Sequence, residues 1–181
     1  MTRIQAVDPA NATGRTKELF EQVQQKMGRV PNVFTLMGNS PAVLAGYLNF
    51  GNALGNGFLD PQLRERIAIV VAETNGCQYC LSAHVALGKM VGLSEQEIKA
   101  ARETHSSDPK VLAALTFVRT LVTRRALIGD ADVQELRQAG FSDGEIAEIL
   151  ANVALNIFTN YFNMVTQPEI DFPQVPLAFP V

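Results

Sequence analysis

Apolar residues recur along most of this chain at the three- and four-residue spacing of an amphipathic helix. One such face comprises Val111, Leu115, Val118 and Val122. A second face comprises Ile146, Ile149, Val153, Ile157 and Tyr161. No segment sustains the two-residue alternation that a half-buried strand requires. The pattern therefore predicts an all-α fold.

Helix starts are marked by side chains that cap the first turn and by prolines, which are tolerated in the first turn. Proline follows a capping side chain at three places, Ser40, Asp60 and Asp108. The capping-box pattern occurs twice, as Ser94 with Glu97 and as Ser142 with Glu145. Together with the apolar spacing, these signals predict helices near 13–27, 41–55, 61–74, 77–91, 95–104, 109–127, 131–138 and 143–163.

The length and composition are typical of one globular domain. The chain has 181 residues, of which 47% are hydrophobic and 18% charged, so it can bury a core of its own. We expect a single domain over 1–181, with 1–40 as a helical N-terminal extension. The proline-rich segment 167–181 carries large apolar side chains, so we expect an extended C-terminal tail that lies against its own domain or a neighbouring subunit.

Charge and hydropathy exclude two classes of partner. The formal net charge is -3, and the basic residues are scattered, so there is no basic field to attract nucleic acid. The N-terminus has no signal-peptide pattern and no segment is apolar enough to cross a membrane. We therefore expect a cytoplasmic protein that binds neither nucleic acid nor membrane.

The only two cysteines, Cys77 and Cys80, lie three residues apart. In a reducing compartment such a pair indicates catalysis or metal binding rather than a structural crosslink. Asn75-Gly76 breaks the preceding helix, so we expect Cys77 in the first turn of a new helix and Cys80 one turn on. Helical spacing brings the two Cβ atoms to about 5–6 Å, which suits a disulfide, and the helix N-terminus favours a thiolate.

His84 follows Cys80 by four residues, so it shares a helix face with both cysteines and can carry a proton beside them. Two carboxylates, Glu65 and Glu73, lie on the preceding helix. Either can orient the imidazole if the two helices pack antiparallel, and the sequence leaves this choice open.

These residues resemble the AhpD-like alkylhydroperoxidases of the carboxymuconolactone decarboxylase superfamily. The family pattern is Glu, eleven residues, Cys-X-X-Cys, three residues and His, and this chain matches it without a gap from Glu65 to His84. The resemblance implies an AhpD-like helical bundle, a homo-oligomer (trimer or hexamer), and thiol-dependent reduction of hydroperoxides without a bound cofactor or metal. It also implies that Cys80 attacks, that Cys77 resolves, and that Glu65 with His84 relays protons.

The chain departs from AhpD at Tyr79, where AhpD has a histidine immediately before the second cysteine. A tyrosine hydroxyl donates hydrogen bonds but is a poor base at neutral pH, so the proton relay is one member short. Tyr79 and Glu73 are therefore expected to support the site rather than to react.

The resulting prediction is a thiol-dependent peroxidase that reduces organic hydroperoxides or hydrogen peroxide and is regenerated by an external dithiol or protein reductant. A carboxymuconolactone-type decarboxylase is the rival enzyme. The non-enzymatic alternatives are a redox sensor and a zinc-binding oligomer, the latter with Cys77, Cys80, His84 and a glutamate as ligands. Disulfide exchange on an α scaffold and a pair of buried structural cysteines also fit the motif.

Overall fold

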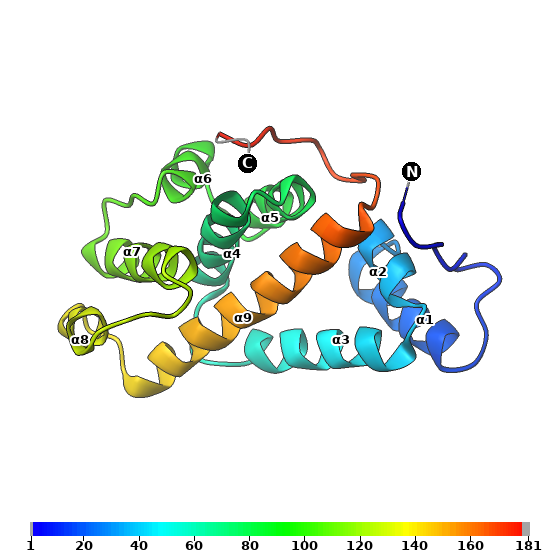
Figure 1. Ribbon diagram of the computed structural model, residues 1–181, viewed down its shortest axis with the longest axis horizontal. Helices are drawn as coiled ribbons and strands as arrows, with labels where there is room; N and C mark the ends of the chain where they lie inside the picture. Colours follow the sequence, from blue (N-terminus) through cyan, green and yellow to red (C-terminus); the bar gives the residue numbers. More distant parts are fainter. Residues whose placement is uncertain (1, 179–181) are drawn as a thin grey trace.

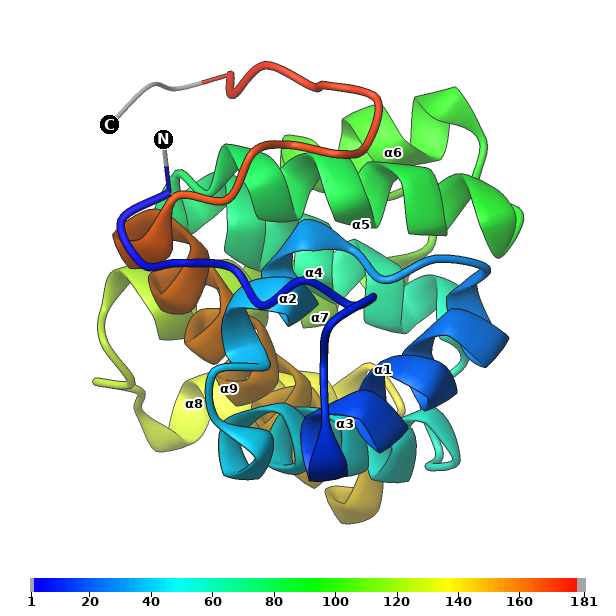
Figure 2. The same cartoon turned by 90° about the vertical axis from the view of Figure 1, so that its right-hand side faces the viewer.

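The fold consists entirely of helices and connecting segments (Figure 1, Figure 2). The computed structural model describes residues 2–178, and no strand occurs among them. The helices are α1 Gly14–Met27, α2 Asn32–Met37, α3 Pro41–Gly55, α4 Pro61–Asn75, α5 Gln78–Met90, α6 Glu95–Arg102, α7 Pro109–Thr123, α8 Asp130–Gln138 and α9 Asp143–Thr166. None of these helices combines the length and the apolar character needed to span a bilayer. The predicted all-α fold class is confirmed.

The structure contains every helix that the sequence predicts and one that it does not. The additional helix, α2, has six residues and begins after Pro31 without a side-chain cap, so it carries none of the usual start signals. Helix α7 ends four residues earlier than predicted. Arg125 and Ala126, which follow it, have φ values of 52° and 62° and cannot continue a right-handed helix.

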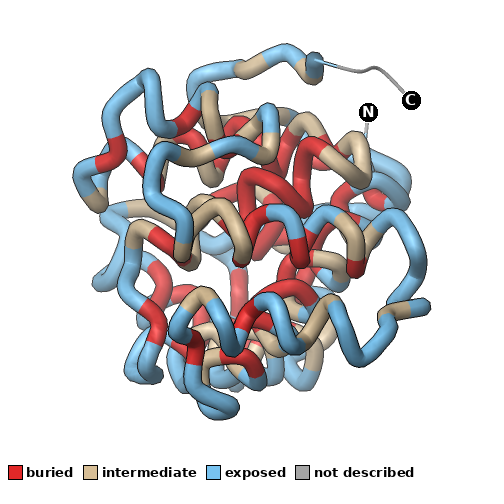
Figure 3. Tube along the Cα trace, turned by 90° about the vertical axis from the view of Figure 1, so that its left-hand side faces the viewer, coloured by how far each residue is buried: buried red, intermediate tan, exposed pale blue. Residues whose placement is uncertain are grey.

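Helix α4 lies at the centre of the molecule and contacts α5, α6, α7 and α9. Its middle turns, residues 67–72, are buried on every side. Figure 3 shows this buried interior surrounded by half-buried and exposed segments. Side chains of α1 and α2 belong to the same hydrophobic cluster as those of α4, so the N-terminal helices share the core that carries the site.

The apolar stripe on α9 is only partly the buried face. Ile146, Ile149 and Val153 are buried as predicted, but Tyr161 is 61% exposed. A four-residue step overshoots one helical turn by about 40°, so Tyr161 lies about 120° around the helix from Ile149. The buried face instead continues through polar side chains, Asn156, Thr159, Asn160, Asn163 and Thr166.

Residues 168–178 form no helix and run along α5, as the red segment in Figure 2 shows. The backbone N–H of Val175 donates to the Ser82 hydroxyl of α5 at 3.0 Å. Four apolar side chains of this segment pack against the core, Ile170, Phe172, Val175 and Leu177. Residues 179–181 of the predicted tail, and residue 1 of the predicted extension, lie outside the described residues.

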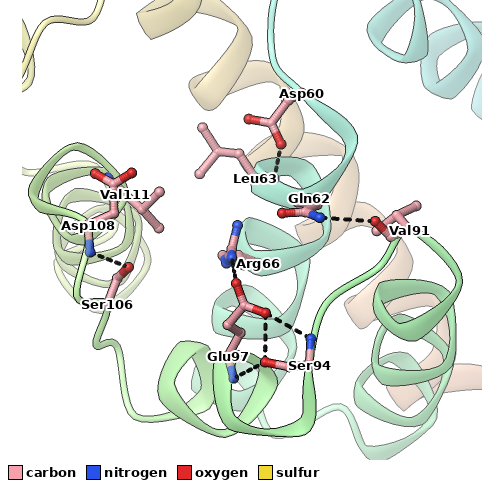
Figure 4. Close-up of polar contacts among 10 residues, drawn as sticks. All are labelled: Asp60, Gln62, Leu63, Arg66, Val91, Ser94, Glu97, Ser106, Asp108 and Val111. Atoms are coloured by element: carbon pink, nitrogen blue, oxygen red, sulfur yellow. Dashed lines mark hydrogen bonds and ion pairs between the residues drawn. The ribbon is translucent and has the colours of Figure 1, made fainter.

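Polar caps fix where the helices around the site begin (Figure 4). The Asp60 carboxylate accepts from the N–H of Leu63 at 2.9 Å at the start of α4. Ser94 and Glu97 form the predicted capping box of α6, and Arg66 of α4 donates to the same Glu97 carboxylate at 2.6 Å. One carboxylate thus caps α6 and ties it to α4.

Candidate active site

The connection between α4 and α5 places the cysteine pair. Gly76 ends α4 with φ of 72°, a left-handed conformation that strains any residue carrying a Cβ. The N–H groups of Gly76 and Cys77 return to carbonyls of the last turn, those of Glu73 at 3.2 Å and Ala72 at 3.0 Å. This tight reversal leaves no room for a loop, so α5 starts directly beside the end of α4.

Cys77 is the N-cap of α5 rather than a residue of its first turn, so the predicted placement is wrong by one position. Its backbone is extended, with φ of -88° and ψ of 91°, and its sulfur accepts from the N–H of Cys80 at 3.3 Å. The reason is that Gly76 is the C-cap of α4, so the next residue, Cys77, serves as the N-cap of α5.

The two cysteines form a disulfide across this first turn, with their Cα atoms 5.3 Å apart. Both residues are only 2% exposed. The Cα separation lies within the usual range for a disulfide, so the pair meets the spacing that the sequence predicts.

The imidazole of His84 is held by Glu65. Its Nδ1 lies 2.8 Å from Oε2 of Glu65, across the contact between α5 and α4. A carboxylate can only accept, so Nδ1 carries the proton and Nε2 of the neutral ring has the lone pair. Of the two carboxylates that the sequence leaves as candidates, Glu65 is the one that orients the imidazole.

Glu73 serves a different part of the molecule. Its carboxylate accepts from Nε of Arg102 at 2.6 Å and from the backbone N–H of Ala178 at 2.7 Å. Arg102 in turn donates to the carbonyl of Pro176 at 2.7 Å. The buried Glu73 thus fastens the C-terminal tail to α6, and its contacts do not include His84.

Tyr79 also binds the tail. Its hydroxyl donates to Asp171 Oδ1 at 2.7 Å and accepts from the N–H of Val33 at 3.2 Å. Burial, reinforced by the hydrogen bond to Asp171, raises the pKa of Tyr79 far above its ordinary value. The hydroxyl stays protonated and its single proton is directed to Asp171, so Tyr79 does not replace the missing histidine of the relay.

Two further residues of the site escape prediction from the sequence. Asn163 of α9, itself 4% exposed, donates from Nδ2 to the sulfur of Cys80 at 3.3 Å. Burial, with a smaller effect of the negative charge of Glu65, raises the pKa of Tyr47 of α3 to about 12. A series of asparagines at helical spacing is the signal for Asn163, whereas nothing local marks Tyr47.

Aromatic rings extend from Tyr47 across three helices. The ring of Tyr47 lies 5.6 Å from that of Phe34 in α2 and 6.3 Å from that of Phe158 in α9. Phe158 lies 6.2 Å from Phe162 on the same helix. These four rings form an aromatic cluster that joins α2, α3 and α9.

The model of the carboxymuconolactone decarboxylase family matches residues 41–121, which include Glu65, both cysteines and His84. The predicted resemblance to the AhpD/carboxymuconolactone decarboxylase superfamily is thus confirmed over this segment. Asn163 and Asp171 lie beyond the matched segment, so the C-terminal part of the chain supplies contacts to Cys80 and Tyr79 that the match does not cover.

Solved structures agree with the superfamily assignment. The alkylhydroperoxidase AhpD core of an uncharacterized peroxidase-related protein from Ralstonia eutropha JMP134 is 23% identical, with a TM-score of 0.85 over 94% of this chain and 92% of that chain. An uncharacterized peroxidase-related protein from Silicibacter sp. TM1040 is 29% identical, with a TM-score of 0.80 over 93% and 94%. No curated protein matches the chain.

A third similar structure has a different described activity. The debrominase Bmp8, as a cysteine-to-alanine variant in complex with 2,3,4-tribromopyrrole, is 22% identical, with a TM-score of 0.80 over 94% of this chain and 92% of that chain. At this level of identity the likeness establishes a shared fold only.

Chemically, the arrangement can support two-electron thiol chemistry. The reduced sulfurs can supply the electrons, and Nε2 of the neutral His84 ring, whose Nδ1 is bound by Glu65, can accept a proton one helical turn from Cys80. Among residues 2–178, no group of three or more histidine, cysteine or acidic side chains is arranged to hold a metal ion.

Proposed function

We propose that this chain is a thiol-dependent peroxidase that reduces organic hydroperoxides or hydrogen peroxide. The observation that carries the proposal is the Cys77–Cys80 disulfide beside the Glu65-bound imidazole of His84. This combination supplies a nucleophile, a resolving thiol and a proton carrier within two turns of one helix.

In the proposed cycle Nε2 of His84 takes the proton of the Cys80 thiol, and the resulting thiolate attacks one peroxide oxygen, so that the O–O bond breaks. Cys80 becomes a sulfenic acid, and the leaving alkoxide, or hydroxide from hydrogen peroxide, takes that proton back from His84 and departs as an alcohol or water. The Cys77 thiol then condenses with the sulfenic acid, which forms the disulfide and releases water. An external dithiol, from a small molecule or a protein, reduces the disulfide and is itself oxidised to a disulfide.

The assignment of Cys80 as the attacking sulfur is supported by its distance from the imidazole along the helix. His84 follows Cys80 by one turn but follows Cys77 by two. The sulfur of Cys77 is also engaged by the N–H of Cys80, as an N-cap acceptor. Cys77 is accordingly proposed as the resolving thiol.

The test is consumption of cumene hydroperoxide with a dithiol reductant present. We expect turnover in the wild type, none in Cys80→Ser, and a loss of about 10²–10⁴-fold in His84→Ala, the range for one general acid–base group. His105→Ala is the matched control, because His105 is the only other histidine and is exposed. Wild-type protein that does not consume peroxide, although its disulfide is reduced and re-formed, would instead support a thiol exchanger or redox sensor.

The aromatic cluster around Tyr47 favours a second candidate, reductive removal of bromine from an aromatic ring. Bmp8 is described as a debrominase with a bound tribromopyrrole. With the cysteine pair as reductant, an aryl bromide and two thiols would give the arene, the disulfide and hydrogen bromide. Release of bromide from 2,3,4-tribromopyrrole by the reduced wild type, lost in Cys80→Ser, would establish this activity.

Two rivals make distinct predictions. A lactone decarboxylase does not need the cysteines, so its turnover of carboxymuconolactone would survive the double change Cys77→Ser and Cys80→Ser. A zinc-binding oligomer would contain stoichiometric metal in elemental analysis of the purified, untagged chain.

We also propose that the protein is a homo-oligomer, a trimer or a hexamer, assembled through the outer side of α9. Four large apolar side chains are exposed there, Phe158, Tyr161, Met164 and Val165. Exposed apolar side chains grouped on one helix are typical of an interface with another protein surface. Light scattering of the wild type and of Val165→Glu tests this, and an unchanged oligomer in the variant would place the interface elsewhere.

A further inference from the structure

The buried face of α9 carries a row of amide side chains that leads to the disulfide. Asn152, Asn156, Asn160 and Asn163 follow one another at steps of three or four residues, and none is more than 6% exposed. Figure 1 shows α9 crossing beside α4 and α5, which are the two helices that flank the cysteines. Four amides on one buried helix face are unusual, because buried polar groups must find partners.

The row divides into two functional halves. Asn152 and Asn156 donate to carbonyls of α9 itself, those of Glu148 at 2.8 Å and Asn152 at 2.9 Å. Asn160 instead accepts from Nδ2 of Asn75, the last residue of α4, at 2.9 Å. Asn163 donates to the sulfur of Cys80. The second half therefore holds both sides of the turn that carries the cysteines.

The stability of the fold does not account for this second half. Oδ1 of Asn163 and Nδ2 of Asn160 are buried and have no hydrogen-bond partner among residues 2–178. Buried atoms of this kind destabilise a protein relative to apolar side chains of the same size. Each of these two amides therefore leaves one buried polar atom unsatisfied, a cost that an apolar side chain does not carry.

We propose that Asn163 is the hydrogen-bond donor that stabilises the Cys80 thiolate when the disulfide is reduced. This inference rests on the proposed function, because it takes Cys80 as the attacking sulfur. A thiolate only accepts hydrogen bonds, so the N–H of Asn163 matches it, and a bond to a charged acceptor is stronger than one to a neutral disulfide sulfur. The contact therefore gains strength only in the reduced, reactive form.

Burial is what makes this donor necessary. Cys80 is 2% exposed, and burial by itself disfavours the charged form of a thiol. A donor in a site from which water is largely excluded counteracts that penalty, because hydrogen bonds to a charge are strong in a low-dielectric interior. The sulfur of Cys77 accepts instead from the backbone N–H of Cys80. The two sulfurs therefore have different donors, and only the donor of Cys80 is a side chain that a substitution can remove.

The test measures ionisation of Cys80 directly. In a Cys77→Ser background Cys80 is the only thiol, and the ultraviolet absorbance of its thiolate is followed against pH. We expect Asn163→Leu to raise the midpoint of this titration by about one pH unit, the effect of losing one hydrogen bond to a charged group. Asn156→Leu is the matched control, because it removes a buried amide of the same helix that bonds only within α9, and it should leave the midpoint unchanged.

An unchanged midpoint in folded Asn163→Leu overturns the inference, as does an equal shift in Asn156→Leu. Circular dichroism verifies folding, and Asn163→Ala provides the same titration if the leucine variant does not fold. The titration uses no peroxide, so it is independent of the proposed activity. A shifted midpoint without peroxide turnover would retain this inference and reject the peroxidase, and turnover with an unchanged midpoint would do the reverse.

Discussion

Replacing Tyr79 by phenylalanine removes one hydroxyl that joins three parts of the chain. The hydroxyl donates to Asp171 of the tail and accepts from the N–H of Val33 at the start of α2. The ring itself stays, including its edge-to-face contact with Phe172 at 5.8 Å. The change therefore isolates the hydrogen bonds from the packing.

The magnitude follows from what each partner loses. The bond to the Asp171 carboxylate belongs to the charged class, worth about 1.5–3 kcal/mol. Asp171 keeps the ion pair with Arg29 and the N–H of Asn32 at 3.0 Å, which limits its loss. The buried N–H of Val33 loses its acceptor, at about 1–3 kcal/mol. Together we expect a decrease of about 2–4 kcal/mol in the free energy of unfolding, a large part of the stability of an ordinary domain.

Urea unfolding followed by circular dichroism measures this change, because the chain has no tryptophan to report by fluorescence. Tyr161→Phe is the matched control, since the 61% exposed Tyr161 loses its hydroxyl without losing a hydrogen bond within residues 2–178. Chymotrypsin cleavage after Leu177 reports separately on release of the tail, because Phe172 is followed by a proline and is not cleaved. A decrease of less than about 0.5 kcal/mol, with the tail still protected, would refute the reasoning.

The remaining predictions concern the turn before Cys77, alkaline stability and acid stability. Gly76→Ala should lower the free energy of unfolding by about 1–2 kcal/mol, because Gly76 has a left-handed φ, and it should also slow disulfide formation. Gly28→Ala, at a position with φ of 74°, should lower the free energy by the same amount without affecting the disulfide. Urea titration measures the stability, and thiol trapping measures disulfide formation. The pKa of Tyr47 is raised to about 12, so the folded state loses this proton at a higher pH than the unfolded chain does. The free energy of unfolding therefore falls as pH rises above about 10. Tyr47→Phe should weaken this pH dependence in thermal unfolding. The N–H of Ser142 and the ammonium of Lys110 lower the pKa of Glu145. The ionised Glu145 therefore stabilises the folded state at neutral pH, and this stabilisation is lost in acid. Glu145→Gln should reduce the loss of thermal stability between about pH 5 and pH 3.

Features encoded within a few residues can be predicted from the sequence. The capping boxes at Ser94 and Ser142 define two helix starts to the residue, because the cap and its partner are only three positions apart. The cysteine pair and His84 are recognisable for the same reason, since they share one helix. Helix α2 escapes prediction because it has neither a side-chain cap nor enough length to show a period.

Features that depend on how two helices face each other cannot be predicted in this way. Glu65 and Glu73 lie on the same helix, and only the rotation of α4 against α5 decides which of them meets His84. The partner of Glu73 is the N–H of Ala178, 105 positions along the chain. The same holds for Tyr79. In the sequence it is only a tyrosine at the position of a relay histidine, and its role follows from the hydrogen bond to Asp171 of the tail.

Helix α9 shows why a binary pattern of apolar and polar residues is misleading at this one element. Its charged residues are confined to the first turns, Asp143, Glu145 and Glu148, and no charge follows up to Thr166. A helix segment without a charged face has no obvious solvent side, so apolar residues cannot by themselves identify the core. The asparagines are the better indicator, because they recur at helical spacing and an amide that is not needed for solubility requires a partner. In this fold the partners of Asn160 and Asn163 lie at the turn that carries the cysteines, while several apolar side chains of the same helix are turned outward.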